Sequence, residues 1–308
     1  MQFPKYDFAS HYLNIRGNRL HYLDEGPPHG EPVIMVHGNP TWSFFFRTLV
    51  TELRDKYRII VPDHIGMGLS DKPDDAHYDY TLSSRVEDLK TLLDHLAVNR
   101  NLTFVVHDWG GMAGLLYATR NPERIGRLII LNTAAFHLPP RKRFPWQLEV
   151  CRTPVLGPLL VRGLNEFCRQ AVRLCITRRP PDPEVVSAYL YPYNSWRNRI
   201  SILRFIQDIP RRASDRVYSM VSEVESHLSQ WRGTPTLICW GLRDFIFDHD
   251  FLATWRRHLP NATVHTFPDA GHYVLEDAGD EIARLLRCFL QDKLGVQDSK
   301  GASDATHP

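Results

Sequence analysis

The amino-acid sequence predicts an α/β fold, in which a mostly parallel, doubly wound sheet is interrupted by a largely helical insertion. Three observations predict it: short apolar runs alternate with longer amphipathic ones, the alternation stops after Ala135, and strand-like runs return from residue 235. The composition agrees, because 43% of the 308 residues are hydrophobic and 23% are charged. These proportions exclude a disordered chain and a collagen-like repeat.

Six continuous runs rich in Val, Ile and Leu are predicted to form buried strands. They cover residues 32–38, 57–63, 102–106, 127–132, 235–241 and 262–267. Such runs are typical of parallel strands that are covered by helices on both faces. Residues 11–15 and 20–23 flank a short turn that contains Gly17, which predicts an antiparallel hairpin at the edge of the sheet.

Helical spacing of apolar residues predicts a helix over residues 82–96 and a last helix over about 279–292. The stretch from 137 to 232 is rich in Pro, Arg and aromatic residues and contains no clear buried strand. The sequence therefore predicts four segments, which are a first part of the core over 1–136, a helical cap over 137–232, a second part of the core over 233–294 and a disordered tail over 295–308.

The predicted cap carries an excess of positive charge. It holds 16 Lys and Arg against 8 Asp and Glu, whereas the whole chain is nearly balanced at 37 against 35. Such a surface is either an ordinary solvated face or a contact surface for an acidic protein, an anionic lipid or a nucleic acid. Because no nucleic-acid-binding motif is present, we expect no nucleic-acid partner.

Location and cofactors are predicted from what the sequence lacks. The N-terminus has no apolar leader, and no run approaches the about 18 apolar residues of a membrane span. We therefore expect a cytoplasmic protein without a transmembrane segment. No His-Glu-x-x-His motif and no Cys/His cluster occurs, so neither a metal site nor a cofactor is expected.

The strongest chemical signal is the stretch Val105–Gly114, where a predicted strand enters small residues that open a helix. Its central residue is Asp108, at the place where many hydrolases carry a nucleophilic serine, and no Gly-x-Ser-x-Gly motif occurs in the chain. A carboxylate with an ordinary pKa of about 3.9 is ionised at neutral pH and attacks carbon without a base. The alternative is that Asp108 merely caps the following helix.

An ester formed on Asp108 needs a further group to turn it over, and the sequence offers 15 histidines. His272 lies in a glycine-containing loop past the last predicted strand, at the sheet edge where ligands gather in open α/β folds. His37 is expected to brace its own loop, and His107 is expected to point away from the site.

Asp244 is the predicted partner that orients His272, because it follows the predicted strand that ends at Gly241. Two nearby carboxylates compete for this role, Asp248 and Asp250. The resulting chain order of nucleophile, acid and histidine is that of α/β-hydrolases.

The loop 37–42 follows the strand that α/β-hydrolases use to supply one oxyanion-hole amide. The backbone N–H groups of Asn39 and Trp109 are candidates to stabilise negative charge on an attacked ester. Their side chains also carry N–H donors suited to a departing anion. We therefore predict Asn39 and Trp109 as the oxyanion and leaving-group donors.

Three stretches, 37–43, 63–73 and 107–111, resemble haloalkane dehalogenases, and the resemblance extends from about residue 10 to 292. It implies the α/β-hydrolase fold, with a mostly parallel eight-stranded sheet flanked by helices and a helical cap inserted after the sixth strand. It also implies site roles for five residues, which are the nucleophile Asp108, the base His272, the acid Asp244 and the halide-type donors Asn39 and Trp109.

A closer resemblance is to a branch of that superfamily, the β-lactone decarboxylases of bacterial long-chain olefin biosynthesis (the third dehalogenase subfamily). Two of the supporting stretches lie in the cap, at 192–196 and 204–210. Four lie in the core, at 61–68, 131–136, 240–245 and 269–277. The resemblance implies that a cis-3-alkyl-4-alkyl-β-lactone is converted to a cis-olefin and CO2. It also implies a hydrophobic small-molecule substrate, no cofactor, and assembly with other olefin-pathway enzymes through the basic cap.

Three alternatives stay open. A haloalkane dehalogenase uses the same five residues to convert a haloalkane and water into an alcohol and halide. An epoxide hydrolase needs paired cap tyrosines, for which Tyr189, Tyr191 and Tyr193 are candidates, although aromatic packing under a loop is the favoured explanation for them. A binding protein on a hydrolase scaffold is the third. Six apolar cap residues suit either a substrate cavity or helix packing: Phe144, Trp146, Leu156, Leu159, Leu160 and Phe167.

Overall fold

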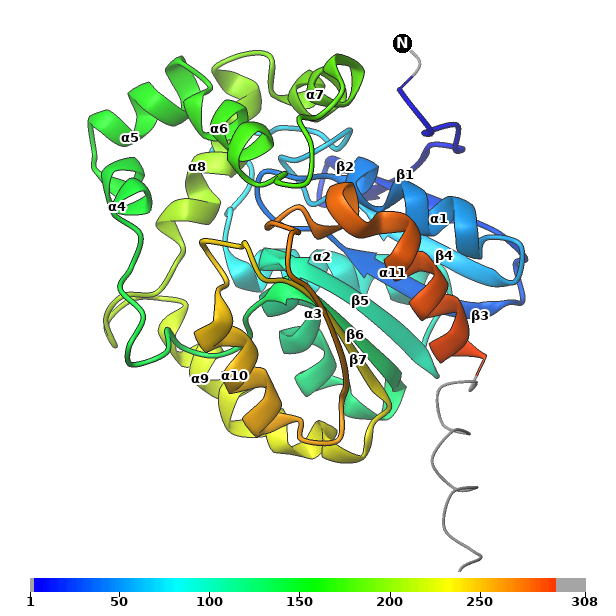
Figure 1. Ribbon diagram of the computed structural model, residues 1–308. Coiled ribbons are helices and arrows are strands. Elements are labelled where there is room, and N and C mark those ends of the chain that lie inside the picture. Colours follow the sequence, from blue (N-terminus) through cyan, green and yellow to red (C-terminus); the bar gives the residue numbers. More distant parts are fainter. Residues whose placement is uncertain (1–2, 292–308) are drawn as a thin grey trace, which may run out of the picture.

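An eight-stranded sheet forms the centre of the computed structural model, which describes residues 3–291 (Figure 1). The strands lie in the order β1-β2-β4-β3-β5-β6-β7-β8. β2 pairs antiparallel with both β1 and β4, and every other neighbouring pair is parallel. The strands are β1 (His11–Ile15), β2 (Asn18–Glu25), β3 (Glu31–Val36), β4 (Tyr57–Pro62), β5 (Leu102–Asp108), β6 (Ile125–Thr133), β7 (Thr236–Gly241) and β8 (Thr263–Phe267).

Helices cover both faces of this sheet, and the cap helices cover the carboxyl ends of its strands. Those that pack on the sheet are α1 (Arg47–Leu53), α2 (Leu82–His95), α3 (Trp109–Arg120), α9 (Tyr218–His227), α10 (His249–His258) and α11 (Val274–Leu290). Those of the cap are α4 (Trp146–Arg152), α5 (Leu156–Pro158), α6 (Glu166–Leu174), α7 (Pro183–Leu190) and α8 (Ile200–Gln207). In Figure 1 the cap helices lie together over the end of the sheet where the parallel strands finish. α9 lies beside α3.

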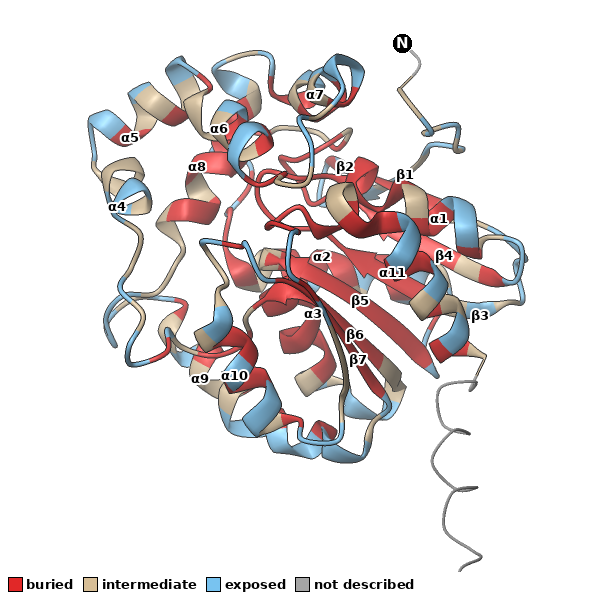
Figure 2. Ribbon diagram, viewed as in Figure 1, coloured by how far each residue is buried: buried red, intermediate tan, exposed pale blue. Residues whose placement is uncertain are grey.

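The central strands are buried on both faces (Figure 2). Along β3, Val33 and Met35 belong to the apolar core that includes α1 and α11. Ile34 and Val36 belong to the apolar core that includes α2, α3 and α10. Because successive side chains of a strand point to opposite faces, a continuous apolar run is what a strand between two helical layers requires.

The predicted fold class is confirmed. Every predicted strand is present within two residues of its expected start, and the predicted hairpin is the antiparallel pair β1–β2 at the sheet edge. All strands precede residue 134 or follow residue 235, so the helical insertion falls between β6 and β7. The tail predicted over 295–308 lies outside the described residues.

The last helix, α11, begins at Val274 rather than near 279. It is kinked at Ala278, whose φ of −130° and ψ of 23° are not helical. The apolar periodicity that predicts this helix belongs to the part after the kink, which explains the late predicted start. Within residues 3–291, no helix has both the length and the apolar character needed to cross a membrane.

Candidate active site

Asp108 lies at the sharp turn between β5 and α3, at the carboxyl edge of the sheet. Its φ of 51° and ψ of −128° lie in a region that residues other than glycine rarely adopt, which is typical of functional turns. A Cβ at Gly38 would collide with the Asp108 carboxylate, and one at Gly110 would collide with the Val36 carbonyl. The Asp108 side chain makes no capping hydrogen bond to α3, so helix capping does not explain this residue.

His272 lies between two carboxylates. Its Nε2 is 3.5 Å from Oδ2 of Asp108, and its Nδ1 hydrogen-bonds Oδ2 of Asp244 at 2.8 Å. The other oxygen of Asp244 accepts the backbone N–H groups of Ile246 (2.7 Å) and Phe247 (3.0 Å). The side chains of Asp108, His272 and Asp244 are all buried. The structure therefore brings together the three residues that the sequence predicts, with His272 between Asp108 and Asp244.

The competing carboxylates have other partners. Asp248 caps α10 through the backbone N–H of Asp250 and also pairs with Lys142. Asp250 contacts His249 on the exposed side of the helix. Neither carboxylate hydrogen-bonds His272.

Interactions among these three residues shift the pKa values of Asp108 and His272 in opposite directions. Burial would raise the pKa of Asp108, but the hydrogen bond and charge of His272 hold it below its ordinary value of 3.8. Burial would lower the pKa of His272, but the charge of Asp244 and the hydrogen bonds to both carboxylates raise it to about 10. Both shifts favour the charged forms of the Asp108 carboxylate and the His272 imidazole.

The two predicted donors lie against the same carboxylate and cavity. The backbone N–H of Asn39 donates to Oδ1 of Asp108 at 2.6 Å, and the Asn39 side-chain amide donates to the carbonyl of Ile202 in α8 at 3.1 Å. Trp109 is half-buried and lines the cavity beside Asp108, with its ring 5.5 Å from that of Phe205. Within residues 3–291 the Trp109 indole N–H makes no hydrogen bond.

Two further residues hydrogen-bond members of this group of three, and the sequence analysis assigns neither of them a role in the site. Asn132, at the end of β6, donates its amide to Oδ2 of Asp244 at 3.0 Å. His107 is expected to point away from the site, yet its Nε2 donates to the carbonyl of His272 at 2.9 Å. The position of Asn132 at the carboxyl end of a strand is the signal that identifies it, because the other site residues share that placement.

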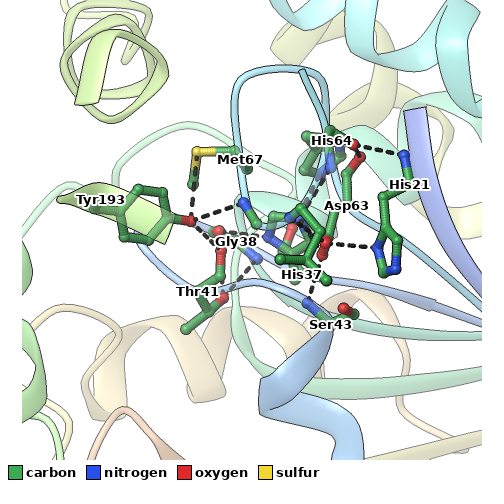
Figure 3. Close-up of polar contacts among 12 residues, drawn as sticks. His21, His37, Gly38, Thr41, Ser43, Asp63, His64, Met67 and Tyr193 are labelled. Atoms are coloured by element: carbon green, nitrogen blue, oxygen red, sulfur yellow. Dashed lines mark hydrogen bonds and ion pairs between the residues drawn. The ribbon is translucent and has the colours of Figure 1, made fainter. Parts of the chain in front are cut away.

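A buried polar network fixes the loop that carries Asn39 (Figure 3). Asp63, directly after β4, accepts the backbone N–H of Ser43 at 2.7 Å and hydrogen-bonds Nδ1 of His21 at 2.8 Å. Burial would raise the pKa of Asp63, but His21 holds it at about 2. His37 Nε2 accepts the backbone N–H of His64 at 3.1 Å, and its Nδ1 donates to the Gly38 carbonyl at 2.8 Å. His37 therefore braces its own loop.

A cavity of about 800 Å³ opens over the Asp108 carboxylate, beneath the cap. Four of the six apolar cap residues considered for it line it, which are Phe144, Trp146, Leu160 and Phe167. Leu156 and Leu159 do not line it and are exposed. A cavity of this size with an apolar lining and a few convergent polar groups is typical of a site for a hydrophobic small molecule.

The cap tyrosines considered for epoxide opening do not reach this cavity. Tyr193 donates its hydroxyl to the carbonyl of Thr41 at 3.2 Å and accepts the N–H of Gly68 (Figure 3). Tyr189 donates its hydroxyl to Glu276, and Tyr191 lies on the surface. None of the three lines the cavity. Their positions are those of packing residues.

The model of the alpha/beta hydrolase fold family matches residues 31–279. A cis-3-alkyl-4-alkyloxetan-2-one decarboxylase of Shewanella oneidensis is 55% identical, over 92% of this chain and 89% of its own length. A protein of the same name from Xanthomonas campestris is 49% identical, over 94% and 99%. A haloalkane dehalogenase of Mycolicibacterium paratuberculosis is more distant, at 32% over 93% and 94%.

Solved structures agree on the architecture. A haloalkane dehalogenase from Agrobacterium tumefaciens C58 superposes with a TM-score of 0.83 at 25% identity, over 92% of this chain and 96% of its own. The chain thus belongs to the α/β-hydrolase fold family and, within it, to the family of the cis-3-alkyl-4-alkyloxetan-2-one decarboxylases. The resemblance that the sequence motifs indicate is confirmed.

Proposed function

We propose that this protein is a β-lactone decarboxylase, which converts a cis-3-alkyl-4-alkyloxetan-2-one to a cis-olefin and CO2 with Asp108 as the nucleophile. The observation that carries the proposal is an ionised carboxylate on a strained turn, held against His272, beneath an apolar cavity. The names of the relatives at 55% and 49% identity support the substrate class.

The balance of atoms favours attack at the ring carbon that bears oxygen. Asp108 Oδ2 forms a bond to that carbon and the ring C–O bond breaks, which leaves both lactone oxygens on a free carboxylate. The C–C bond to this carboxylate then breaks, its electron pair forms the C=C bond, and Asp108 departs with the pair of its ester C–O bond. Attack at the carbonyl would instead separate the two oxygens that must leave together as CO2. Inversion followed by anti elimination preserves the cis geometry, and the reaction consumes no water.

His272 and the two donors act on charge in this scheme. Attack turns the Asp108 carboxylate into a neutral ester, and its departure restores the negative charge beside the His272 imidazolium. His272, oriented by Asp244, stabilises the leaving carboxylate, while Asn39 and Trp109 are placed to donate to the carboxylate released from the lactone. The same imidazole serves as the general base in a dehalogenase, where water must open the ester.

A paired assay tests the proposal. Purified protein is incubated with a cis-dialkyl β-lactone and, separately, with a 1-bromoalkane, and olefin and bromide are measured. We expect olefin with little bromide, and loss of olefin formation in Asp108→Ala. We also expect His272→Phe to accumulate a covalent adduct on Asp108, detected by mass spectrometry. Full activity of Asp108→Ala would contradict the role of Asp108.

A haloalkane dehalogenase is the second candidate, because a relative of that name is 32% identical over most of the chain. It uses the same five residues, so the assay separates the two functions by product. Bromide without olefin would assign the protein to the dehalogenases and would leave the roles of Asp108 and His272 in place.

Two further expectations belong to the proposal, a cytoplasmic location and assembly with other olefin-pathway enzymes through the basic cap. The excess of cations over residues 137–232 supports the second. Its test is salt-sensitive co-sedimentation with those enzymes. If no association were observed at low salt, this expectation would be contradicted.

A further inference from the structure

The mouth of the cavity exposes large apolar side chains. Four residues that line the cavity also reach the surface: Leu138 (41% exposed), Trp146 (70%), Leu174 (50%) and Phe245 (43%). They come from three separate parts of the chain, so folding assembles this apolar rim around one opening. A contiguous apolar patch is uncommon on the surface of a protein with no partner and marks a contact surface.

The apolar surface continues beyond the opening. Val155 is 76% exposed, and Leu156 and Leu159 are each 49% exposed, within α5 or next to it in the chain. This helix contacts α4, which carries Trp146, and the two lie side by side at one end of the cap (Figure 1). This end of the cap therefore adds exposed apolar side chains close to the helix that carries Trp146.

Cations lie close to this surface, and two carboxylates near them are paired, whereas Glu166, which lines the cavity, has no ion-pair partner within residues 3–291. Lys142 pairs with Asp248, and Arg211 pairs with Glu149 while its guanidinium lies 4.0 Å above the Phe144 ring. Further arginines are exposed and have no ion-pair partner within residues 3–291, which are Arg141, Arg143, Arg173 and Arg212. The mouth therefore presents apolar side chains among unpaired positive charges.

We propose that the cavity mouth docks on the surface of an anionic phospholipid bilayer. Tryptophan and leucine side chains enter the boundary between headgroups and acyl chains, and arginines meet lipid phosphates. The opening then faces the acyl chains, from which an apolar substrate enters the cavity without crossing water. This last step rests on the proposed function, because it needs a hydrophobic substrate, whereas the docking itself does not.

Vesicle sedimentation tests the docking. The full chain is mixed with vesicles of pure phosphatidylcholine or of phosphatidylcholine with phosphatidylglycerol. We expect it to sediment with the anionic vesicles at low salt and much less with the neutral ones. Each cation near an anionic surface contributes roughly fivefold in affinity, so the triple variant Arg141→Gln, Arg143→Gln, Arg212→Gln should bind about 100-fold more weakly.

A matched control removes the same charge elsewhere. Lys56, Arg100 and Arg256 are exposed, lie outside the cap and have no ion-pair partner within residues 3–291. Their triple change to Gln should leave vesicle binding near that of the unchanged protein. Equal losses in both triple variants, or no sedimentation of the unchanged protein, would overturn the proposal.

Trp146 reports insertion directly. The difference in fluorescence between the unchanged protein and Trp146→Phe should shift to the blue on addition of anionic vesicles, because the indole leaves water. Arg141, Arg143 and Arg212 do not line the cavity, so their triple variant should keep full activity on a short-chain, water-soluble lactone and lose activity on a vesicle-embedded one. Vesicle binding without activity on any lactone would overturn the proposed function alone. Activity without vesicle binding would overturn the docking alone.

Discussion

The carboxyl edge of the sheet and the cap that covers it are built on different principles. At the carboxyl ends of the strands, Asp63, Asp108 and Asp244 each end or closely follow a strand and accept backbone N–H groups. The cap contributes an apolar lining and closes the cavity from above. Backbone geometry at the strand ends therefore positions the reactive groups, while side-chain packing in the cap decides what fits beside them.

The two regions are joined by a few buried polar contacts. Arg47 of α1 pairs with Glu276 of α11, and Tyr189 of cap helix α7 donates its hydroxyl to the same carboxylate. Asp277 accepts the N–H groups of Thr177 and Arg178, which lie in the cap, and of Gly271 beside His272. The first turns of α11 thus fix the cap and the His272 loop together.

The largest effect that we expect on the sheet-edge chemistry comes from Asp244→Asn. It replaces the carboxylate that faces His272 Nδ1 with a neutral amide, so the imidazolium loses its main stabilising charge. Turnover should fall by about 10³-fold or more, as it does when the orienting acid of a catalytic triad is neutralised. The pKa of His272, raised to about 10 in the unchanged protein, should fall, and NMR of the ring nitrogens measures it.

The sign of the pH dependence follows from this shift. Because the folded-state pKa of His272 lies above its ordinary value of 6.5, the stability that it contributes is complete below pH 6.5 and is lost as the pH rises toward 10. Asp248→Asn is the matched control, since Asp248 makes no hydrogen bond to His272. An unchanged His272 pKa in Asp244→Asn would show that Asp244 does not set it.

The sequence places a candidate site residue where that residue ends or closely follows a strand. Asp108, Asp244 and Asn39 are such residues, and the strands themselves are evident from continuous apolar runs. Asn132 also lies at a strand end, but its hydrogen bond to Asp244, like that of His107 to the His272 carbonyl, joins residues 112 and 165 positions apart, and no local pattern encodes these pairings. The structure brings the predicted side chains together, and their roles stay predictions until the variants are measured.

The cap is less predictable for a physical reason. Apolar residues such as Leu160 and Leu159 are neighbours in sequence, yet one lines the cavity and the other is exposed. A short, irregular helix does not maintain the regular periodicity that separates a buried face from an exposed one. The segment around them is such a helix, since Leu159–Gly163 is wound more widely than an α-helix.

A smaller effect, on folding rather than turnover, is expected from Asp63→Asn. The Asp63 carboxylate accepts N–H groups from several sides, and an amide would direct its own donors at some of them. Removing one partner of a buried charged network costs about 3–5 kcal/mol of the free energy of unfolding. Denaturant unfolding of the variant measures it.

The same carboxylate predicts an acid limb of stability. Its folded-state pKa of about 2 lies below the ordinary 3.8, so its contribution is present above pH 3.8 and is lost as the pH falls toward 2. Asp63→Asn should lose that part of the acid dependence. The control is Asp55→Asn, a change at an exposed carboxylate on the surface. Equal stability of both variants would contradict a structural role for the Asp63 network.

The smallest effects are expected at two neighbouring tyrosines. Variants of these two residues distinguish the contact between cap and core from the polar groups of the site. Tyr189 and Tyr273 are both buried, and their ring centroids lie 5.2 Å apart. The Tyr189 hydroxyl donates to Glu276, whereas the Tyr273 hydroxyl has no hydrogen-bond partner within residues 3–291. A hydrogen bond to a charged group contributes about 1.5–3 kcal/mol, so Tyr189→Phe should destabilise the protein by that amount. Tyr273→Phe removes a buried hydroxyl that bonds nothing, so its stability should stay unchanged or rise slightly.

Thermal unfolding of the two variants side by side measures this difference, since both remove one oxygen from neighbouring rings. Tyr273 also lines the cavity beside His272, and Tyr189 does not. If Tyr273→Phe lowers turnover at unchanged stability, the unpaired hydroxyl contacts the substrate, and the polar part of the site extends beyond the strand ends. If it changes neither quantity, the reactive groups are confined to the carboxyl edge of the sheet. Equal destabilisation in both variants would contradict the assignment of Glu276 as the partner that ties the cap to the core.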